Sequence, residues 1–169
     1  MSNNKHTDIL VIGSGPGGYA AAFRAADLGR EVTLVDKDPT LGGVCLNRGC
    51  IPSKTLLHIS KVLEEAESLK KMGVTFTKPT IDIDLVRDWK NKVVSQLSGG
   101  IGQMAKARKV NTIQAEATFL SNNEVQLKSE SSTEKITFDH CIIASGSSST
   151  IIPGICLLYT SPSPRDAHK

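Results

Sequence analysis

Residues 8–18, which read Asp-Ile-Leu-Val-Ile-Gly-Ser-Gly-Pro-Gly-Gly, decide the fold. They open with a short apolar run, rich in β-branched side chains, of the kind that is buried in a parallel sheet. An alanine-rich, helix-prone segment follows from Tyr19 to Leu28, and residues 31–35 predict a second strand that ends at Asp36. This order predicts a strand–helix–strand unit of about 30 residues.

Three glycines in the turn, Gly13, Gly15 and Gly18, have the spacing of a dinucleotide-binding fingerprint. Gly13 permits the tight turn, Gly15 lets the backbone approach a pyrophosphate, and Gly18 lets the helix pack close to the sheet. The helix N-terminus then presents free N–H groups to the phosphates. Asp36 stands 18 residues after Gly18, where a carboxylate accepts hydrogen bonds from both ribose hydroxyls and disfavours a 2′-phosphate. The alternative is an ordinary tight turn with a surface Asp, and the motif does not distinguish FAD from NAD.

The rest of the chain predicts two helices and then a run of short strands. Residues 37–49 predict a glycine-containing loop, whereas residues 52–72 and 85–107 carry apolar side chains at helical spacing and predict an αα-hairpin. Strands are expected at residues 110–113, 117–120, 124–127, 135–138 and 141–144. We therefore expect an α/β fold of three layers on a parallel sheet, with an inserted αα-hairpin and a small antiparallel β-meander.

Two cysteines, Cys45 and Cys50, lie close together in the sequence. On a regular helix, Cα atoms five residues apart are separated by roughly 8–9 Å, beyond the limit of roughly 7 Å for a disulfide. A bridge therefore requires a distorted helix, which Gly49 and Pro52 favour. A bridge that closes so short a loop adds little stability, which favours a redox role, and a helix N-terminus with Lys54 would hold a thiolate. The alternatives are two unpaired thiols, a solvated Lys54 and a metal site. The four histidines are too scattered to complete a metal site, so we expect no metal.

Length and composition exclude several classes of protein. The 169 residues carry a net charge of +3, which is too small and too evenly spread for a nucleic-acid footprint. No apolar run reaches the roughly 18–20 residues that span a bilayer, and the start has no apolar signal segment, so we expect a cytoplasmic protein. Residues 156–169 fit no preceding element and resemble the translation of a sequencing adapter. We expect residues 1–155 to form one incomplete domain and residues 156–169 to be a non-native tail.

The glycine fingerprint, Asp36 and the segment Gly-Gly-Val-Cys-Leu-Asn-Arg-Gly-Cys-Ile-Pro-Ser-Lys at residues 42–54 follow one another in the order of a known family. Together they resemble the FAD-dependent pyridine nucleotide–disulfide oxidoreductases, from residue 5 to about residue 155. Leu46-Asn47 and residues 51–54 favour the branch that oxidises dihydrolipoamide in 2-oxo acid dehydrogenase complexes. Glutathione and mercuric reductases differ from this chain at those positions. The resemblance implies a Rossmann-like FAD-binding domain.

The resemblance also implies a role for each matching residue. Three of them are expected to be catalytic: Cys45 as the thiol that exchanges with the lipoamide disulfide, Cys50 as the thiol that faces the flavin, and Lys54 beside the flavin ring. Ala117 stands where the family usually has glycine, and its backbone contacts FAD only if its φ is negative. The residues expected to contact FAD are Gly13, Gly15, Pro16, Gly17, Gly18, Asp36, Lys37, Gly42, Gly43, Val44, Cys45, Lys54, Ala117, Ala144, Ser145 and Gly146.

The implied reaction converts dihydrolipoamide and NAD⁺ into lipoamide and NADH through the disulfide and FAD. The NAD site, an interface domain and a His–Glu acid–base pair are expected beyond residue 155, so the chain is expected to be an inactive piece of a longer enzyme. The implied partners of the full-length protein are a lipoyl domain of a 2-oxo acid dehydrogenase complex and a second copy of itself, with no nucleic acid and no membrane. The alternatives are another disulfide reductase of the family and a non-catalytic FAD-binding or redox-sensing module.

Overall fold

The computed structural model describes residues 5–147, and its first three elements form the strand–helix–strand unit that the sequence predicts. β1 spans Lys5–Ile12, α1 spans Pro16–Asp27, and β2 spans Val32–Asp36. β1 and β2 pair in parallel. Pro16 stands at the first position of α1, where its missing N–H costs no intrahelical hydrogen bond. The expectations for the tail, residues 156–169, lie outside the described residues.

The described strands form one six-stranded sheet in the order β3-β2-β1-β6-β5-β4. The added strands are β3 (Asn111–Gln114), β4 (Glu116–Ser121), β5 (Glu124–Lys128) and β6 (Thr133–Ile143). β3, β2, β1 and β6 pair in parallel, whereas β4, β5 and β6 pair antiparallel and form the predicted meander. The sheet is therefore mixed, and β6 belongs to both of its parts.

The expectation of two separate strands at residues 135–138 and 141–144 is wrong, because β6 runs through both. The polar pair Asp139-His140 does not interrupt the strand, since His140 pairs with Ile9 of β1. Both polar side chains are exposed, so the backbone ladder continues without burying them.

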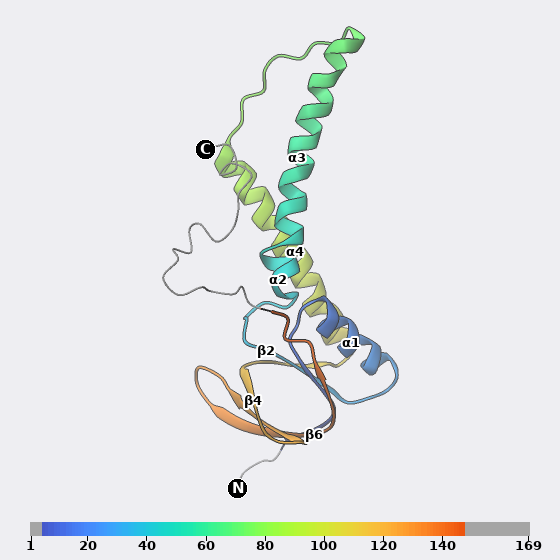
Figure 1. The fold of residues 1–169 in the computed structure, drawn as a ribbon, viewed down its shortest axis with the longest axis vertical. Coiled ribbons are helices and arrows are strands. Elements are labelled where there is room, and N and C mark those ends of the chain that lie inside the picture. Colours follow the sequence, from blue (N-terminus) through green and yellow to red (C-terminus); the bar gives the residue numbers. More distant parts are fainter. Residues whose placement is uncertain (1–4, 148–169) are drawn as a thin grey trace.

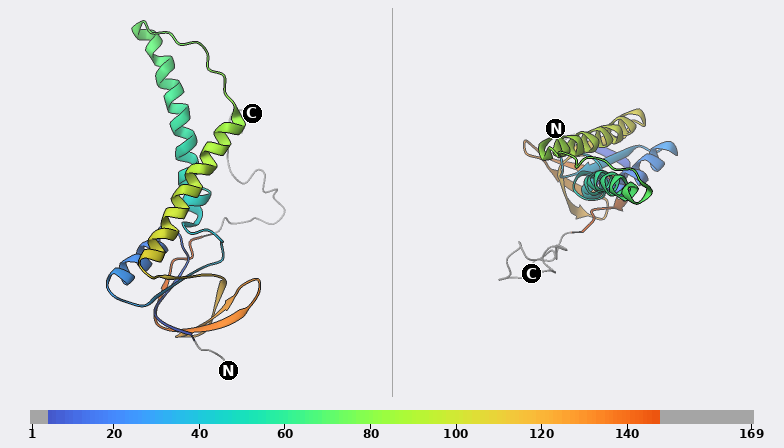
Figure 2. Two further views of the ribbon diagram at one scale, coloured as in Figure 1. Left: turned by 180° about the vertical axis from the view of Figure 1, so that it is seen from behind. Right: turned by 90° about the horizontal axis from the view of Figure 1, so that it is seen from above.

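The parallel strands separate two hydrophobic layers, because neighbouring side chains on a strand point to opposite faces. Val11 and Leu34 are buried on the face that α1 and the end of α4 (Ile83–Ala107) cover. Leu10 and Val35 are buried on the opposite face, together with meander residues such as Phe138. Figures 1 and 2 show α1 and α4 on one side of these strands and the curled meander on the other. The predicted α/β arrangement is confirmed.

A helical hairpin is inserted between β2 and β3 and projects away from the sheet (Figure 1). Before α4 it contains α2 (Gly43–Asn47), α3 (Cys50–Ser68) and a 3-10 turn at Leu69–Met72. The expectation of a loop over residues 37–49 is wrong at residues 43–47, which form α2. The glycines at positions 99, 100 and 102 do not break α4, because Ile101 and Ala105 are buried in the core and hold this part of the helix.

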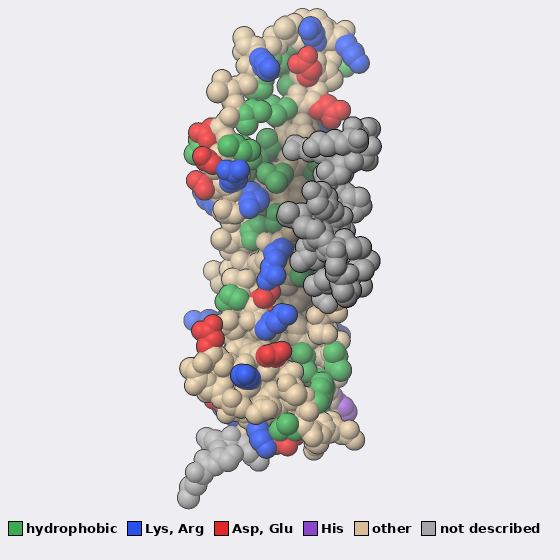
Figure 3. Space-filling model, turned by 60° about the vertical axis from the view of Figure 1, so that its left-hand side comes forward, with side chains coloured by type: hydrophobic (Ala, Val, Ile, Leu, Met, Phe, Trp, Pro, Cys, Tyr) green, Lys and Arg blue, Asp and Glu red, His purple; other side chains and the backbone are tan. Residues whose placement is uncertain are grey.

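Much of the hairpin surface is apolar. No residue of α3 is buried, and Leu57 is 66% exposed. On α4, Trp89 is 54% exposed. Figure 3 shows hydrophobic side chains along the upper part of the molecule, where the hairpin lies. None of the helices within residues 5–147 combines the length and the apolar character needed to cross a membrane.

Candidate functional site

The glycine turn between β1 and α1 is shaped by two close backbone contacts. Gly13 has φ +100°, and a Cβ there would lie 2.2 Å from the carbonyl oxygen of Ala144. A Cβ on Gly18 would lie 1.7 Å from the carbonyl oxygen of Gly13. Only glycine fits these two positions, because α1 packs directly against the turn and the turn packs directly against the end of β6.

Gly15, unlike Gly13 and Gly18, is not packed closely against other protein atoms on its side-chain side. A Cβ built there would meet no atom within 4 Å, and its φ of −65° suits any residue. Gly15 is the N-cap of α1, and no side chain caps this helix end. The packing of the protein therefore gives no reason for glycine at this position. The bare backbone instead leaves room for a group outside the protein at a helix N-terminus, which attracts anions.

Asp36 at the end of β2 is tied to this turn. One carboxylate oxygen, Oδ2, accepts hydrogen bonds from the backbone N–H and the hydroxyl of Ser14, both at 2.6 Å. The other oxygen, Oδ1, accepts the backbone N–H of Asp38 at 2.9 Å. Burial by itself raises the pKa of Asp36, but these hydrogen bonds and nearby Lys37 outweigh burial and hold the pKa below its ordinary value. Asp36 is therefore ionised, and about one of its four acceptor positions is left for a ligand.

A pocket of about 190 Å³ lies between the glycine turn, the end of β2 and the meander. Five residues that the sequence assigns to the cofactor line it: Gly13, Asp36, Lys37, Ala117 and Ser145. Lys109 is the only non-glycine residue within positions 5–147 that has a positive φ, so the backbone of Ala117 is in the ordinary range. The condition set for a contact through Ala117 is met.

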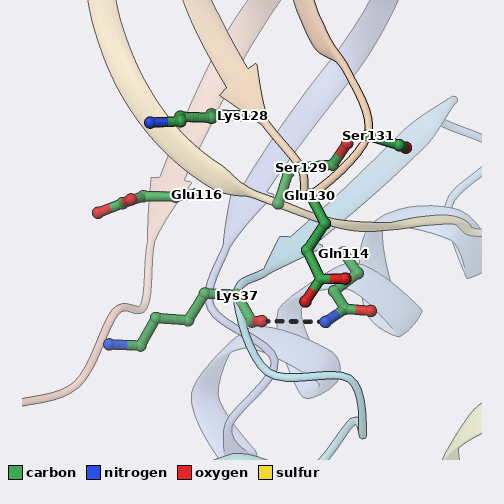
Figure 4. Close-up of a pocket in the computed structure, with 8 residues that line it drawn as sticks. Lys37, Gln114, Glu116, Lys128, Ser129, Glu130 and Ser131 are labelled. Atoms are coloured by element: carbon green, nitrogen blue, oxygen red, sulfur yellow. Dashed lines mark hydrogen bonds between the residues drawn. The ribbon is translucent and has the colours of Figure 1, made fainter.

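A second, more polar pocket of about 390 Å³ adjoins the first and shares Lys37, Ala115 and Glu116 with it (Figure 4). Gln114 donates a hydrogen bond through Nε2 to the carbonyl oxygen of Lys37 at 3.4 Å. Gln114, Glu116 and Lys128 also line this pocket and are not among the residues that the sequence predicts to contact FAD. Gln114 and Glu116 lie two residues apart where β3 ends and β4 begins, and the pairing of β4 with β5 brings Lys128 beside Glu116.

The cysteine pair lies next to the glycine turn. Gly42 donates its backbone N–H to the carbonyl oxygen of Ser14 at 2.9 Å, and a Cβ on Gly43 would lie 2.6 Å from the Cα of Gly15. α2 therefore begins in contact with the turn. Its residue Cys45 forms a disulfide with Cys50, the first residue of α3.

The helix is broken between the two cysteines, as the spacing predicts. α2 ends at Asn47, and α3 begins only after Gly49, whose φ of −121° and ψ of −98° are not helical. The break brings the two Cα atoms to 4.8 Å, well within the range that a disulfide spans. Cys45 is half-buried and Cys50 is exposed.

Other predicted residues lie around this centre. Lys54 is exposed and follows Cys50 by one helical turn. Val44 is 61% exposed, and Gly146, with φ +72°, has no neighbour within 4 Å of a Cβ built on it. Cys141 is separate from the cysteine pair, on β6, where burial raises the pKa of its thiol.

One group of side chains outside this site has the composition of metal ligands. The ligand atoms of His6, Asp8 and Asp139 lie within 4.8 Å of one another. Nε2 of His6 is 3.5 Å from Oδ1 of Asp139, and Nδ1 is 3.0 Å from the hydroxyl of Thr137. No sequence pattern indicates this group, because its members come from β1 and β6, which are far apart in the chain.

These features define a class of protein: an α/β domain with a dinucleotide-type glycine turn and a cysteine pair fixed beside it. Residues 7–162 match the family model described as pyridine nucleotide-disulphide oxidoreductase, and the chain belongs to this family. It is 48% identical over 155 residues to a dihydrolipoyl dehydrogenase of Vibrio cholerae, covering 92% of this chain and 33% of the relative. A Bacillus subtilis dihydrolipoyl dehydrogenase is 48% identical over 147 residues, covering 87% of this chain and 31% of the relative.

A third relative gives a similar result. The protein named dihydrolipoyl dehydrogenase 3 of Haloarcula marismortui is 47% identical over 151 residues, covering 88% of this chain and 31% of the relative. The chain therefore spans about a third of the length of the curated relatives that it matches.

Proposed function

We propose that this chain is the FAD-binding part of a dihydrolipoyl dehydrogenase, an enzyme that oxidises dihydrolipoamide with NAD⁺. The observation that supports this most is the contact between Gly43 and Gly15, which sets the Cys45–Cys50 disulfide directly beside an anion-attracting helix end. A redox disulfide beside a dinucleotide site is the combination that electron transfer between a dithiol and a flavin requires. The identity of 48% to enzymes of that name supports the choice of substrate.

The residues fit FAD in three respects. Gly15 leaves its outer side open where a pyrophosphate would lie, beside the uncapped N-terminus of α1. Asp36 is ionised and keeps about one acceptor position for a ribose hydroxyl. The pocket lined by Gly13, Lys37 and Ser145 also includes Asp36 in its wall. When bound, FAD would relay an electron pair between the protein thiols and the nicotinamide.

The chain's own part in the reaction is a thiol–disulfide exchange. One thiolate of dihydrolipoamide attacks the sulfur of Cys45, the Cys45–Cys50 bond breaks, and the electron pair of that bond leaves on Cys50 as a thiolate. The second thiol of dihydrolipoamide then displaces Cys45, so that lipoamide is released and the protein holds two reduced sulfurs. The ammonium group of Lys54, one turn from Cys50, favours the anionic form of the Cys50 sulfur.

The proposed partners follow from the same reaction. The substrate is carried by a lipoyl domain of a 2-oxo acid dehydrogenase complex, and the whole protein forms a homodimer with an NAD site outside residues 1–155. The whole protein acts in the cytoplasm.

Alkylation of two single-substitution variants tests the two cysteine roles, with labelling read for each peptide separately because Cys141 and Cys156 remain in both variants. In Cys45→Ser, the remaining Cys50 should react with iodoacetamide at least several-fold more slowly after FAD is added, because FAD covers it. In the matched variant Cys50→Ser, the reaction of Cys45 should be unchanged by FAD. Equal protection of both thiols, or protection of Cys45 alone, would contradict the assignment.

A further inference from the structure

A chain of hydrogen bonds connects the segment that carries the disulfide to the carboxylate of the nucleotide site. Arg48 lies between the two cysteines, and its guanidinium forms an ion pair with Oδ2 of Asp38 at 2.5 Å. The backbone N–H of Asp38 in turn donates to Oδ1 of Asp36 at 2.9 Å. Asp36 is held by Ser14 of the glycine turn. Each link joins residues that the cofactor and the disulfide need in fixed positions.

Arg48 stands at the point where the helix must break. It is the C-cap of α2, with φ −133°, and its backbone N–H donates to the carbonyl oxygen of Val44 at 2.9 Å. A regular helix would hold the two cysteine Cα atoms roughly 8–9 Å apart, whereas here they are 4.8 Å apart. The side chain of Arg48 is therefore anchored at one of the two non-helical residues, Arg48 and Gly49, that separate α2 from α3.

The residue directly before Arg48 secures the same segment through different contacts. Nδ2 of Asn47 donates hydrogen bonds to the carbonyl oxygens of Gly43 at 3.1 Å and Leu41 at 3.2 Å. These bonds join the end of α2 to the loop that precedes it. The Arg48–Asp38 pair is the contact that joins the segment to the end of β2.

We propose that the Arg48–Asp38 ion pair positions the cysteine segment, residues 45–50. The ion pair thereby favours formation of the Cys45–Cys50 disulfide and couples this disulfide to occupancy of the site at Asp36. Once the disulfide is reduced, no covalent bond keeps the two thiols close. The ion pair then holds the broken-helix geometry and raises the effective concentration of each thiol near the other. Both residues act as positioning residues, because neither exchanges sulfur or electrons. The coupling to Asp36 rests on the proposed function, whereas the effect on the disulfide does not.

The test is the equilibrium between the protein dithiol and oxidised dithiothreitol, which gives the protein disulfide and reduced dithiothreitol. The 169-residue chain is equilibrated in buffers of graded dithiothreitol ratio at pH 7, the thiols are alkylated, and the oxidised fraction is read by mass. Arg48→Gln and Asp38→Asn should each lower the equilibrium constant for disulfide formation by about two- to five-fold, which is the range that an exposed ion pair supplies. The double variant should be no lower than either single variant, because the interaction is shared.

The signs of the two single variants separate positioning from a simple effect of charge. Arg48→Gln removes a positive charge near the thiols, and Asp38→Asn removes a negative one. A through-space charge effect on the thiolates would therefore shift the equilibrium in opposite directions, whereas loss of positioning shifts it in the same direction. Arg87→Gln and Asp84→Asn break a comparable exposed pair on α4, at 2.8 Å, and should change nothing. Opposite signs, additive effects or an equal effect of the control variants would overturn the proposal.

A second arm repeats the measurement with FAD. If Asp38 transmits occupancy of the site, FAD should raise the equilibrium constant in the parent chain and raise it less in Asp38→Asn, as reciprocal coupling requires. An equal rise in both would refute the coupling while leaving the positioning intact. If no FAD binds at all, the proposed function fails, and the comparison of the five variants without FAD still decides whether the ion pair positions the disulfide.

Discussion

Two alanine substitutions at the glycine turn separate what the fold requires from what a cofactor requires. A Cβ at Gly18 lies 1.7 Å from the carbonyl oxygen of Gly13, so even a tight contact of 3.0 Å needs α1 and the turn to move apart by about 1.3 Å. The obstructing atom belongs to the backbone and cannot rotate away. Overpacking costs about 1–3 kcal/mol, and a rigid backbone partner places Gly18→Ala near 3 kcal/mol. That cost lowers Tm by about 6–12 °C for a chain of this size.

For Gly15→Ala we expect no loss of stability but weaker FAD binding. The added methyl group meets no protein atom within 4 Å, and φ is already −65°. Stability should be unchanged or should rise by up to about 1 kcal/mol, because alanine restricts the unfolded chain. The methyl group nevertheless occupies the place proposed for the pyrophosphate. An overpacking cost of about 1–3 kcal/mol there weakens FAD binding by about 5- to 150-fold.

Scanning calorimetry gives Tm for both variants, and quenching of flavin fluorescence gives the Kd for FAD. We predict that Gly15→Ala is stable and binds FAD poorly, and that Gly18→Ala is unstable. A Gly15→Ala variant that binds FAD as well as the parent chain would refute the cofactor role of this position. A Gly15→Ala variant as unstable as Gly18→Ala would refute the description of the turn.

Three further predictions concern single contacts. Asp36 has a lowered pKa in the folded chain, so its contribution to stability is complete above the unfolded pKa of roughly 3.9 and is lost as pH falls through the lower folded pKa. Asp36→Asn should therefore flatten the loss of stability below about pH 4, measured by urea unfolding. The same loss of stability in the variant and the parent chain below this pH would contradict the prediction. Reduction of the Cys45–Cys50 disulfide should lower the free energy of unfolding by about 2 kcal/mol, because the closed loop is short. Denaturant unfolding with and without dithiothreitol measures this, and a loss of about 4 kcal/mol or more would assign the bridge a structural role. Asp82→Ala removes the side-chain cap that accepts the N–H groups of Asp84 and Leu85, at 3.0 and 3.1 Å, and should destabilise the chain by about 1 kcal/mol. Helical circular dichroism through a thermal unfolding measures this loss, and an unchanged unfolding midpoint would contradict the role of the cap.

The sequence predicted the part of the fold whose signals are local. The apolar run of β1, the glycine turn and the alanine-rich helix lie next to one another, and their order alone determines the parallel pairing of β1 and β2. The break between Cys45 and Cys50 was also predictable, because helix geometry separates cysteines at this spacing and Gly49 permits a deviation.

The errors have definite physical causes. α2 was missed because a helix of five residues is too short to show a periodic pattern. The continuity of β6 was missed because Asp139 and His140 look like a turn, while their backbone groups are held by the ladder to β1. The helix predicted at residues 85–107 is confirmed despite its glycines, because burial of Ile101 and Ala105 outweighs the low helix propensity of glycine.

Contacts between distant segments could not be read from the sequence. The Arg48–Asp38 pair depends on the path of the loop between β2 and α2, and no local pattern indicates it. The polar pocket that contains Glu116 and Lys128 depends on which strands become neighbours. The proposed positioning contact and the wider pocket therefore come from the structure.

The most direct test of the account is the visible spectrum of the purified chain with FAD, recorded before and after reduction by a dithiol. The account predicts that bound flavin gains a long-wavelength band on reduction, that Cys45→Ser shows the band without added reductant, and that Cys50→Ser never shows it. A chain that retains no flavin, or a band that survives Cys50→Ser, would contradict the placement of this cysteine pair beside the cofactor.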